Sequence, residues 1–185
     1  MSQKLLEYDI HLTTRMRIAE RPGLLRTLAS VLAHSGDSWF WLAGFILIWL
    51  LGPPSWRPMV QSLVIAILLT AVLVLILKFS VRRRRPEGSW GNIYRNTDPH
   101  SFPSGHAARA FMIAVVASAL APAWLAVLLW VWAPLVAIAR VAMGVHYVSD
   151  IIAGAILGIL VAWIGLQIYE PILMWFSQLI NVPLW

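Results

Sequence analysis

The residues best suited to chemistry in this sequence form three clusters, and the last of them holds Arg140, His146 and Asp150. His146 and Asp150 are four residues apart, so on a helix they would lie on one face. The carboxylate can then accept a proton from one imidazole nitrogen and leave the other nitrogen basic and fixed in direction. This is the arrangement of a nucleophile and the group that orients it. An ordinary helix-stabilising His–Asp pair would have the same spacing.

The second cluster is the sequence Pro-Ser-Gly-His at 103–106. Ser104 can cap a helix that starts here, and Gly105 lets a ligand approach the backbone. The free N–H groups of a helix N-terminus bind anions, so His106 would stand beside a bound anion. A capping turn that carries an incidental histidine would also explain the pattern.

The first cluster consists of cationic side chains. Lys78 and Arg85 are seven residues apart, which is two helical turns, so both point the same way if the helix continues to Pro86. We assign the three arginines at 82–84 to a positively charged anchor at the membrane surface. Lys78, Arg85 and Arg140 would repel one another unless an anion lies between them. The three clusters therefore predict a site for an anionic substrate.

These clusters occur in a chain of unusual composition. Its 185 residues are 60% hydrophobic and only 12% charged, with a mean hydropathy of +0.76. Soluble domains have about 25% charged residues, so this composition predicts an integral membrane protein. The 11 Trp residues suit the interfacial aromatic belts of such a protein. The absence of cysteine from the sequence excludes disulfides, cysteine nucleophiles and thiolate metal sites.

Long uncharged runs predict five membrane spans, since about 20 helical residues cross the hydrocarbon layer. Two spans are expected at 38–56 and 59–77, joined by a very short loop. A hairpin of two spans is expected within 104–144. The last span is expected at 151–169, where Pro171 would end the helix.

The terminal segments are too polar or too short to span the membrane. Residues 2–20 mix polar and apolar side chains, which predicts an amphipathic helix at the interface. Residues 22–34 predict a second short helix that ends in a turn at 35–37, and residues 172–180 predict a short interfacial helix. The expected fold is all-α: a polytopic transmembrane helical bundle of about five to six spans with an N-terminal interfacial helix.

These elements are expected to form one domain with its positive charge at one membrane face. Residues 1–185 make a single membrane-embedded domain in this interpretation, with an interfacial region at 1–36 and the catalytic motifs at 78–150. Of the 14 Lys and Arg residues, all except Arg57 fall on the face that carries the three clusters. The positive-inside rule would place that face in the cytoplasm, whereas charge that attracts substrate would not fix the orientation. The catalytic face of this expected multi-pass cell-membrane protein therefore stays open.

Taken together, the clusters resemble the three-part signature of the type 2 phosphatidic acid phosphatases, a superfamily shared with the vanadium haloperoxidases. The three parts occur in the family's order and spacing. They are Lys78, six residues, then Arg85-Pro86; Pro103-Ser104-Gly105-His106; and Arg140, five residues, then His146, three residues, then Asp150. Ala139 stands where the third part usually has serine, so one phosphate-binding hydroxyl is missing.

The resemblance implies an α-helical bundle and metal-independent hydrolysis of a phosphate monoester or diphosphate through a phosphohistidine. Carried over by position, His146 attacks phosphorus and Asp150 orients it, while His106 protonates the leaving oxygen and then activates water. The groups that would bind the phosphoryl oxygens are Lys78, Arg85, Arg140, Ser104 and the Gly105 N–H. The resemblance implies no metal or other cofactor, and the acids of the catalytic stretch show no metal-ligand spacing.

The leading functional hypothesis is a membrane phosphatase for a lipid phosphate or diphosphate. Phosphatidate, phosphatidylglycerophosphate, a polyprenyl diphosphate and the phosphates of lipid A all fit a cationic site at the interface. An oxidative enzyme that uses vanadate is disfavoured, since the members of the superfamily with that activity are soluble. A non-catalytic transporter, channel or lipid-phosphate binder with a basic vestibule remains an alternative. The expected partners are the lipid substrate and the bilayer, not nucleic acid, and the oligomeric state is open.

Overall fold

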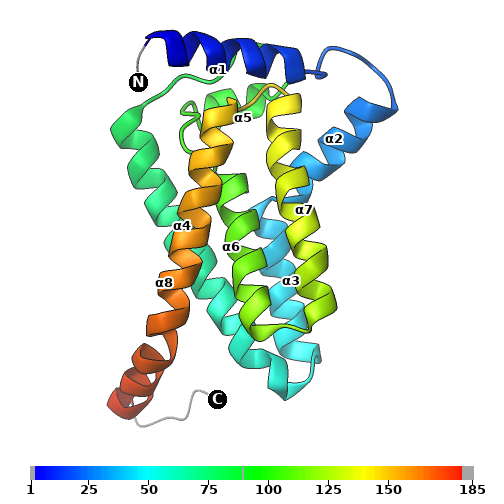
Figure 1. Cartoon of the computed structure of the whole chain (residues 1–185). Coiled ribbons are helices and arrows are strands. Elements are labelled where there is room, and N and C mark those ends of the chain that lie inside the picture. The colour runs from blue at the N-terminus through cyan, green and yellow to red at the C-terminus, as the bar shows by residue number, and fades with distance from the viewer. Residues whose placement is uncertain (1–2, 89, 181–185) are drawn as a thin grey trace.

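The computed structural model describes residues 3–88 and 90–180, whose regular elements are helices joined by short loops. In chain order they are α1 (Gln3–Met16), α2 (Leu24–Ser35), α3 (Ser38–Leu51), η1 (Pro54–Trp56), α4 (Arg57–Val81), α5 (Asn92–Thr97), α6 (Gly105–Leu120), α7 (Ala123–Ala142) and α8 (Val148–Ile180). Figure 1 shows α3, α4, α6, α7 and α8 running along one another as a bundle, while α1 lies across one end. The expected all-α bundle is confirmed.

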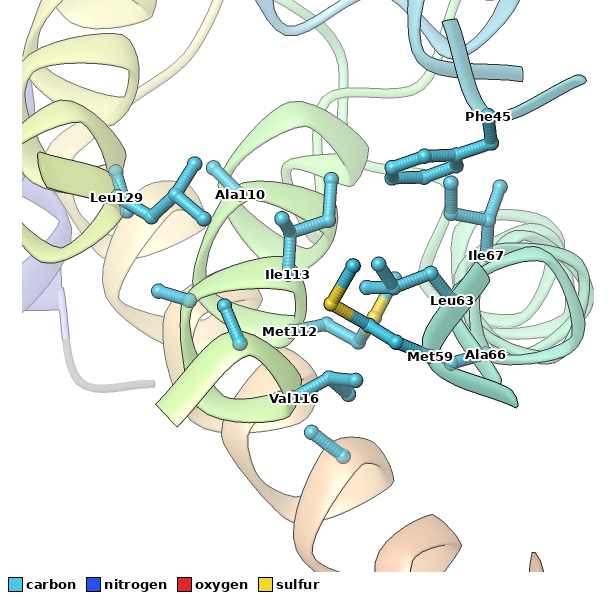
Figure 2. Close-up of a cluster of buried hydrophobic side chains, with 14 of the residues drawn as sticks. Phe45, Met59, Leu63, Ala66, Ile67, Ala110, Met112, Ile113, Val116 and Leu129 are labelled. Carbon is cyan, nitrogen blue, oxygen red and sulfur yellow. The ribbon is translucent and has the colours of Figure 1, made fainter. Parts of the chain in front are cut away.

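Helix α6 is the centre of the bundle and packs against α4, α7 and α8. In Figure 2, Met112 and Ile113 of α6 meet Leu63 and Ile67 of α4, with Phe45 of α3 beside them. A helix that is apolar on all sides is stable when other helices or lipid surround it. Because lipid is as apolar as these side chains, close packing stabilises the contacts within the bundle. The N-terminal residues of α6 are therefore held from several sides.

Two glycines let α8 approach α6 more closely than any larger residue would allow. A Cβ atom added to Gly154 would lie 2.4 Å from the backbone oxygen of Ser104, and one added to Gly158 would lie 1.9 Å from that of Ala108. This four-residue spacing of glycines is a frequent contact motif of membrane helices. The close approach also brings the start of α8 to the start of α6, where the Ser104 N–H donates to the Asp150 backbone oxygen across 3.0 Å.

Among the described residues, three helical segments are long and apolar enough to cross a membrane by themselves: Pro54–Val81, Ala123–Ala142 and Val148–Ile168. Helices α2 and α3 pass the same test together, as a pair bent by 58°. Helices form in all five predicted span regions, but α3 has 14 residues and α6 has 16. The number of spans therefore stays a prediction, whereas the membrane-protein class is supported by the long helices and by large apolar side chains on their outer surfaces.

The predicted end of the last helix is wrong. Helix α8 continues through Pro171 to Ile180, so residues 172–180 extend this helix and do not form a separate one. Proline removes one backbone N–H and disfavours a soluble helix, but helices of membrane proteins tolerate it more often. At the other end of the chain, helices over 2–20 and 22–34 are confirmed as α1 and α2, and α2 stops just before Gly36, at the expected turn.

The contact between α6 and α8 yields a prediction about stability. Gly158→Ala should lower the melting temperature in detergent, because the new methyl group would overlap the Ala108 carbonyl and overpacking costs about 1–3 kcal/mol. Gly165→Ala is the matched control, since no heavy atom lies within 4 Å of its Cβ position. Alanine has the higher helix propensity, so this variant should be as stable as wild type or more stable. A Gly158→Ala protein at least as stable as Gly165→Ala would contradict the packing described here.

Candidate active site

One cavity at the end of the bundle that α1 covers collects most of the predicted site residues (Figure 1). Its volume is about 240 Å³. Six of the eight predicted residues line it: Lys78, Arg85, Gly105, His106, Arg140 and His146. They come from the end of α4, the loop after it, the start of α6, the end of α7 and the loop before α8. The other two, Ser104 and Asp150, are fully buried.

The imidazole of His146 lies between an aspartate and an arginine. Its Nδ1 atom lies 3.5 Å from Oδ2 of Asp150, which also accepts a 2.8 Å hydrogen bond from the Tyr147 N–H. Arg85 Nη1 lies 3.2 Å from Nε2 on the other side of the ring. With Nδ1 protonated, the single lone pair of the ring lies on Nε2, where it accepts from Arg85 in this structure, whereas Nδ1 has no hydrogen-bond partner among the described residues. Burial lowers the pKa of His146 well below its ordinary value, and the nearby cations lower it further.

Lys78 and Arg85 share a carboxylate that the sequence analysis did not select. Asp98 Oδ2 accepts from Lys78 Nζ, and it accepts from Arg85 Nη2 across 2.8 Å. Arg85 also donates from Nε to the Asp98 backbone oxygen and from Nη1 to that of Val145, at 2.7 Å and 2.8 Å. Burial lowers the pKa of Arg85 despite the attraction of Asp98. Asp98 thus anchors both cations from one side.

Arg140 is the least compensated of the three cations. It is 1% exposed, and its Nε and Nη1 atoms have no hydrogen-bond partner among the residues that the structure describes. Its guanidinium group lies over the Tyr94 ring, 4.4 Å from the centroid. A cation–π contact offsets only part of the cost of burying a charge. The free N–H groups of Arg140 therefore point to an anionic ligand in the cavity.

Ser104 and Gly105 begin α6 as expected, but their surroundings differ. The Ser104 hydroxyl accepts from the Ala107 N–H across 3.4 Å, so Ser104 serves as the helix cap. Gly105 lines the cavity, where the N–H groups of the first helical turn carry partial positive charge. In this structure the serine hydroxyl is used by the backbone, so direct binding of phosphate by Ser104 stays a prediction.

His106 also has an aspartate partner, which the sequence analysis treated only as part of a turn. His106 Nε2 lies 2.7 Å from Oδ1 of Asp37, in the segment between α2 and α3. Asp37 Oδ2 is 3.2 Å from Nδ1 of His34, and Arg109 donates to the Gly36 backbone oxygen. His106 stands between the cavity described above and a second, more open cavity of about 460 Å³. An ionisable residue inside a long apolar stretch was the available signal for Asp37.

The assignment of all three arginines at 82–84 to a surface anchor is wrong for Arg83. Arg83 Nη1 donates to Oδ1 of Asp150 across 2.8 Å, and its guanidinium lies 3.9 Å from the centroid of the Tyr147 ring. Arg82 and Arg84 are exposed. The difference arises because Arg82 takes a left-handed backbone conformation (φ 52°) that ends α4, so the following side chains no longer follow the helical spacing.

The fold and the site together define a class of protein: an α-helical membrane protein with a buried cationic cavity and two histidines, each near an aspartate. Among the described residues, no three His, Cys, Asp or Glu side chains are grouped closely enough to hold a metal ion. The model of the PAP2 superfamily matches residues 59–173, which is more than half of the chain. The chain belongs to the PAP2 superfamily.

Individual relatives agree with this assignment. The probable lipid phosphate phosphatase beta of Arabidopsis thaliana is 30% identical, over 88% of this chain and 89% of its own. Among solved structures, Aquifex aeolicus LpxE has a TM-score of 0.69 at 30% identity and covers 85% of this chain and 93% of its own. A transmembrane PAP2-type phosphatidylglycerolphosphate phosphatase from Bacillus subtilis shares the fold, with a TM-score of 0.76 at 24% identity and coverages of 92% and 89%. The chain is a membrane phosphatase of this superfamily.

The environment of His146 yields a prediction about pH. A lowered pKa keeps the imidazole unprotonated at mildly acidic pH, so the acidic limb of the kcat/KM profile that His146 sets should lie below the ordinary histidine value of about 6.5. Lys78→Met removes one of the cations that lower this pKa, and the limb should move to higher pH. Lys4→Met changes an exposed lysine of α1 and should leave the limb in place. The same substrate is used for all three proteins, so the titration of the substrate cancels in the comparison. An acidic limb that does not move in Lys78→Met would contradict the effect of the nearby cations on the pKa of His146.

Proposed function

We propose that this membrane phosphatase hydrolyses a phosphate monoester or diphosphate of a lipid through a phosphohistidine formed on His146. The observation that carries the proposal is the unpartnered guanidinium of Arg140, buried in one cavity with Lys78, Arg85 and Nε2 of His146. Phosphoryl transfer needs mainly a positioned nucleophile and positive charge around the equatorial oxygens. The grouping of these cations around one cavity supports such a role.

In the first step, Nε2 of His146 attacks phosphorus. A nitrogen–phosphorus bond forms, the bond from phosphorus to the leaving oxygen breaks, and the developing imidazolium is stabilised by Asp150, 3.5 Å from Nδ1. Protonated His106, which lines the same cavity, gives its proton to the leaving oxygen. The carboxylate of Asp37 keeps the His106 ring in position and stabilises its protonated form, which burial and the nearby Arg140 disfavour.

In the second step, water replaces His146 on phosphorus. His106, now neutral, accepts a proton from the attacking water, and the nitrogen–phosphorus bond breaks with its electron pair returning to His146. Inorganic phosphate leaves, and both histidines regain their starting protonation states. The proton balance closes on the two histidines, because His106 gives one proton in the first step and receives one in the second.

The walls of the cavity support a lipid as the rest of the substrate. Ala71, Val74 and Leu75 of α4 line the cavity together with the cations. An anionic end held by cations beside an apolar wall suits phosphatidate, phosphatidylglycerophosphate or a polyprenyl diphosphate. A probable lipid phosphate phosphatase and a phosphatidylglycerolphosphate phosphatase are among the relatives named above, which supports the substrate class without selecting one member. We place the protein in the cell membrane as a multi-pass protein.

The proposed nucleophile can be tested by mutation and by trapping. His146→Ala should reduce phosphate release from a panel of lipid phosphates in detergent by at least a thousandfold, since the covalent route is lost. Acid-labile phosphate should be bound to wild-type protein after rapid quench, and His146→Ala should not trap it. Wild-type turnover should persist in EDTA. His11→Ala, at an exposed histidine of α1, is the matched control and should behave like wild type.

Activity of His146→Ala within about tenfold of wild type would contradict the nucleophile assignment, because a change of mechanism costs several kcal/mol. A wild-type protein that binds lipid phosphates but releases no phosphate would favour the non-catalytic binder or transporter. Loss of wild-type turnover in EDTA, restored by a divalent metal, would contradict the metal-independent mechanism.

A further inference from the structure

We propose that Asp9 of the N-terminal helix α1 is a positioning residue for catalysis, because it holds Arg83 against Asp150, the carboxylate that faces the nucleophile. This inference rests on the proposed function, in which His146 attacks phosphorus and Asp150 orients it. It adds α1 to the catalytic unit, although α1 lies far from the three motifs in sequence and supplies none of the residues that line the cavity.

Asp9 is buried, and all of its contacts in the structure lead toward the start of α8. Its Oδ2 atom accepts from Arg83 Nη2 across 2.8 Å and from the Ser149 hydroxyl, while its Oδ1 atom accepts from the Ser149 N–H across 3.0 Å. Asp9 is 7% exposed. A carboxylate buried to this extent must be paired, and here its partners are one cation and the helix that carries Asp150.

Arg83 transmits this contact to the site. One end of its guanidinium bonds Asp9, and Nη1 donates to Oδ1 of Asp150 across 2.8 Å and to Oγ of Ser149 across 2.6 Å. The other oxygen of Asp150 is the one that faces Nδ1 of His146. A carboxylate bridged in this way cannot rotate freely. The chain of contacts from Asp9 through Arg83 therefore fixes the Asp150 carboxylate, which lies 3.5 Å from Nδ1 of His146.

Helix α1 also caps α8. The first N–H groups of any helix have no partner within that helix, and in α8 those of Val148 and Ser149 are satisfied by Thr13 Oγ1, at 3.2 Å, and by Asp9. Asp9 and Thr13 are four residues apart and so share one face of α1. Both are buried, whereas the large apolar residues Leu5 and Tyr8 are 59% and 66% exposed. Polar contacts thus fix how α1 sits on the bundle.

A double-mutant cycle separates positioning from a merely structural role. Asp9→Asn keeps the shape and the acceptor for the Ser149 N–H but removes the charge that holds Arg83. We expect kcat to fall at least tenfold with KM changed less than twofold, because the phosphate-binding cations are untouched. The kcat of Arg83→Gln should fall as much as that of Asp9→Asn, or more. Adding Asp9→Asn to Arg83→Gln should then change kcat less than twofold, since Asp9 acts through Arg83.

Two controls lie on the same helix. Thr13→Val removes only a cap of α8 and should lower the melting temperature while leaving kcat within twofold of wild type. Glu7→Gln removes a negative charge from an exposed position and should leave the melting temperature and kcat unchanged. Three results would each overturn the inference. The first is a kcat of Asp9→Asn equal to that of wild type. The second is a loss of kcat in the double variant equal to the product of the two single losses, and the third is a loss in Thr13→Val as large as that in Asp9→Asn.

Failure of the positioning inference can be told apart from failure of the proposed function. If wild-type protein hydrolyses lipid phosphates and Asp9→Asn matches it, only the positioning inference fails. If wild-type protein hydrolyses none of them, the proposed function fails, and the ring signals of His146 in histidine-labelled protein still test the positioning. These signals should move in Asp9→Asn and stay in place in Thr13→Val. Unmoved signals in Asp9→Asn would overturn the inference in that case too.

Discussion

The burial of three cations around one small cavity is the constraint on which the rest of this structure depends. Lys78 and Arg85 share Asp98, but Nε and Nη1 of Arg140 have no hydrogen-bond partner among the described residues, and the Tyr94 ring compensates its charge only in part. A buried charge without a partner costs several kcal/mol. The close packing of α8 on α6 and the rigid centre of the bundle supply the framework that holds these groups together in spite of their repulsion. A phosphoryl group between them would remove the conflict.

The aspartates of the chain are arranged around these cations and the two histidines. All four aspartates of the sequence lie at or just behind the site: Asp37 meets His106, Asp98 meets Lys78 and Arg85, Asp150 meets His146, and Asp9 meets Arg83. Asp98 lines the cavity beside Lys78 and Arg85, whereas Asp9, Asp37 and Asp150 contact their partners from outside it. The structure thus neutralises the groups enough to bury them and leaves their field directed at the substrate.

The sequence predicts the parts of this arrangement that depend on local spacing. The helices, the cap at Ser104 and the convergence of the three motifs follow from apolar runs and from short motifs. The partners of those motifs do not follow from local spacing. Asp37 lies 69 residues from His106, and Asp9 lies 74 residues from Arg83. Asp98 lies 20 residues from Lys78 and 13 from Arg85. Arg83 was misassigned because the left-handed residue before it breaks the helical spacing. The end of α8 was misplaced because the rule for proline comes from soluble helices.

The affinity of the cavity for vanadate, relative to inorganic phosphate, tests the central claim most directly. Vanadate adopts the five-coordinate geometry of the transferring phosphorus, so a site complementary to the transition state should bind it more tightly than phosphate, competitively with lipid substrate. Arg85→Ala and Arg140→Ala should lose this preference, whereas Arg84→Ala, at an exposed arginine, should keep it. Equal affinity for the two ions in wild type, or tight vanadate binding in Arg140→Ala, would contradict the account that these cations are arranged around a reacting phosphoryl group.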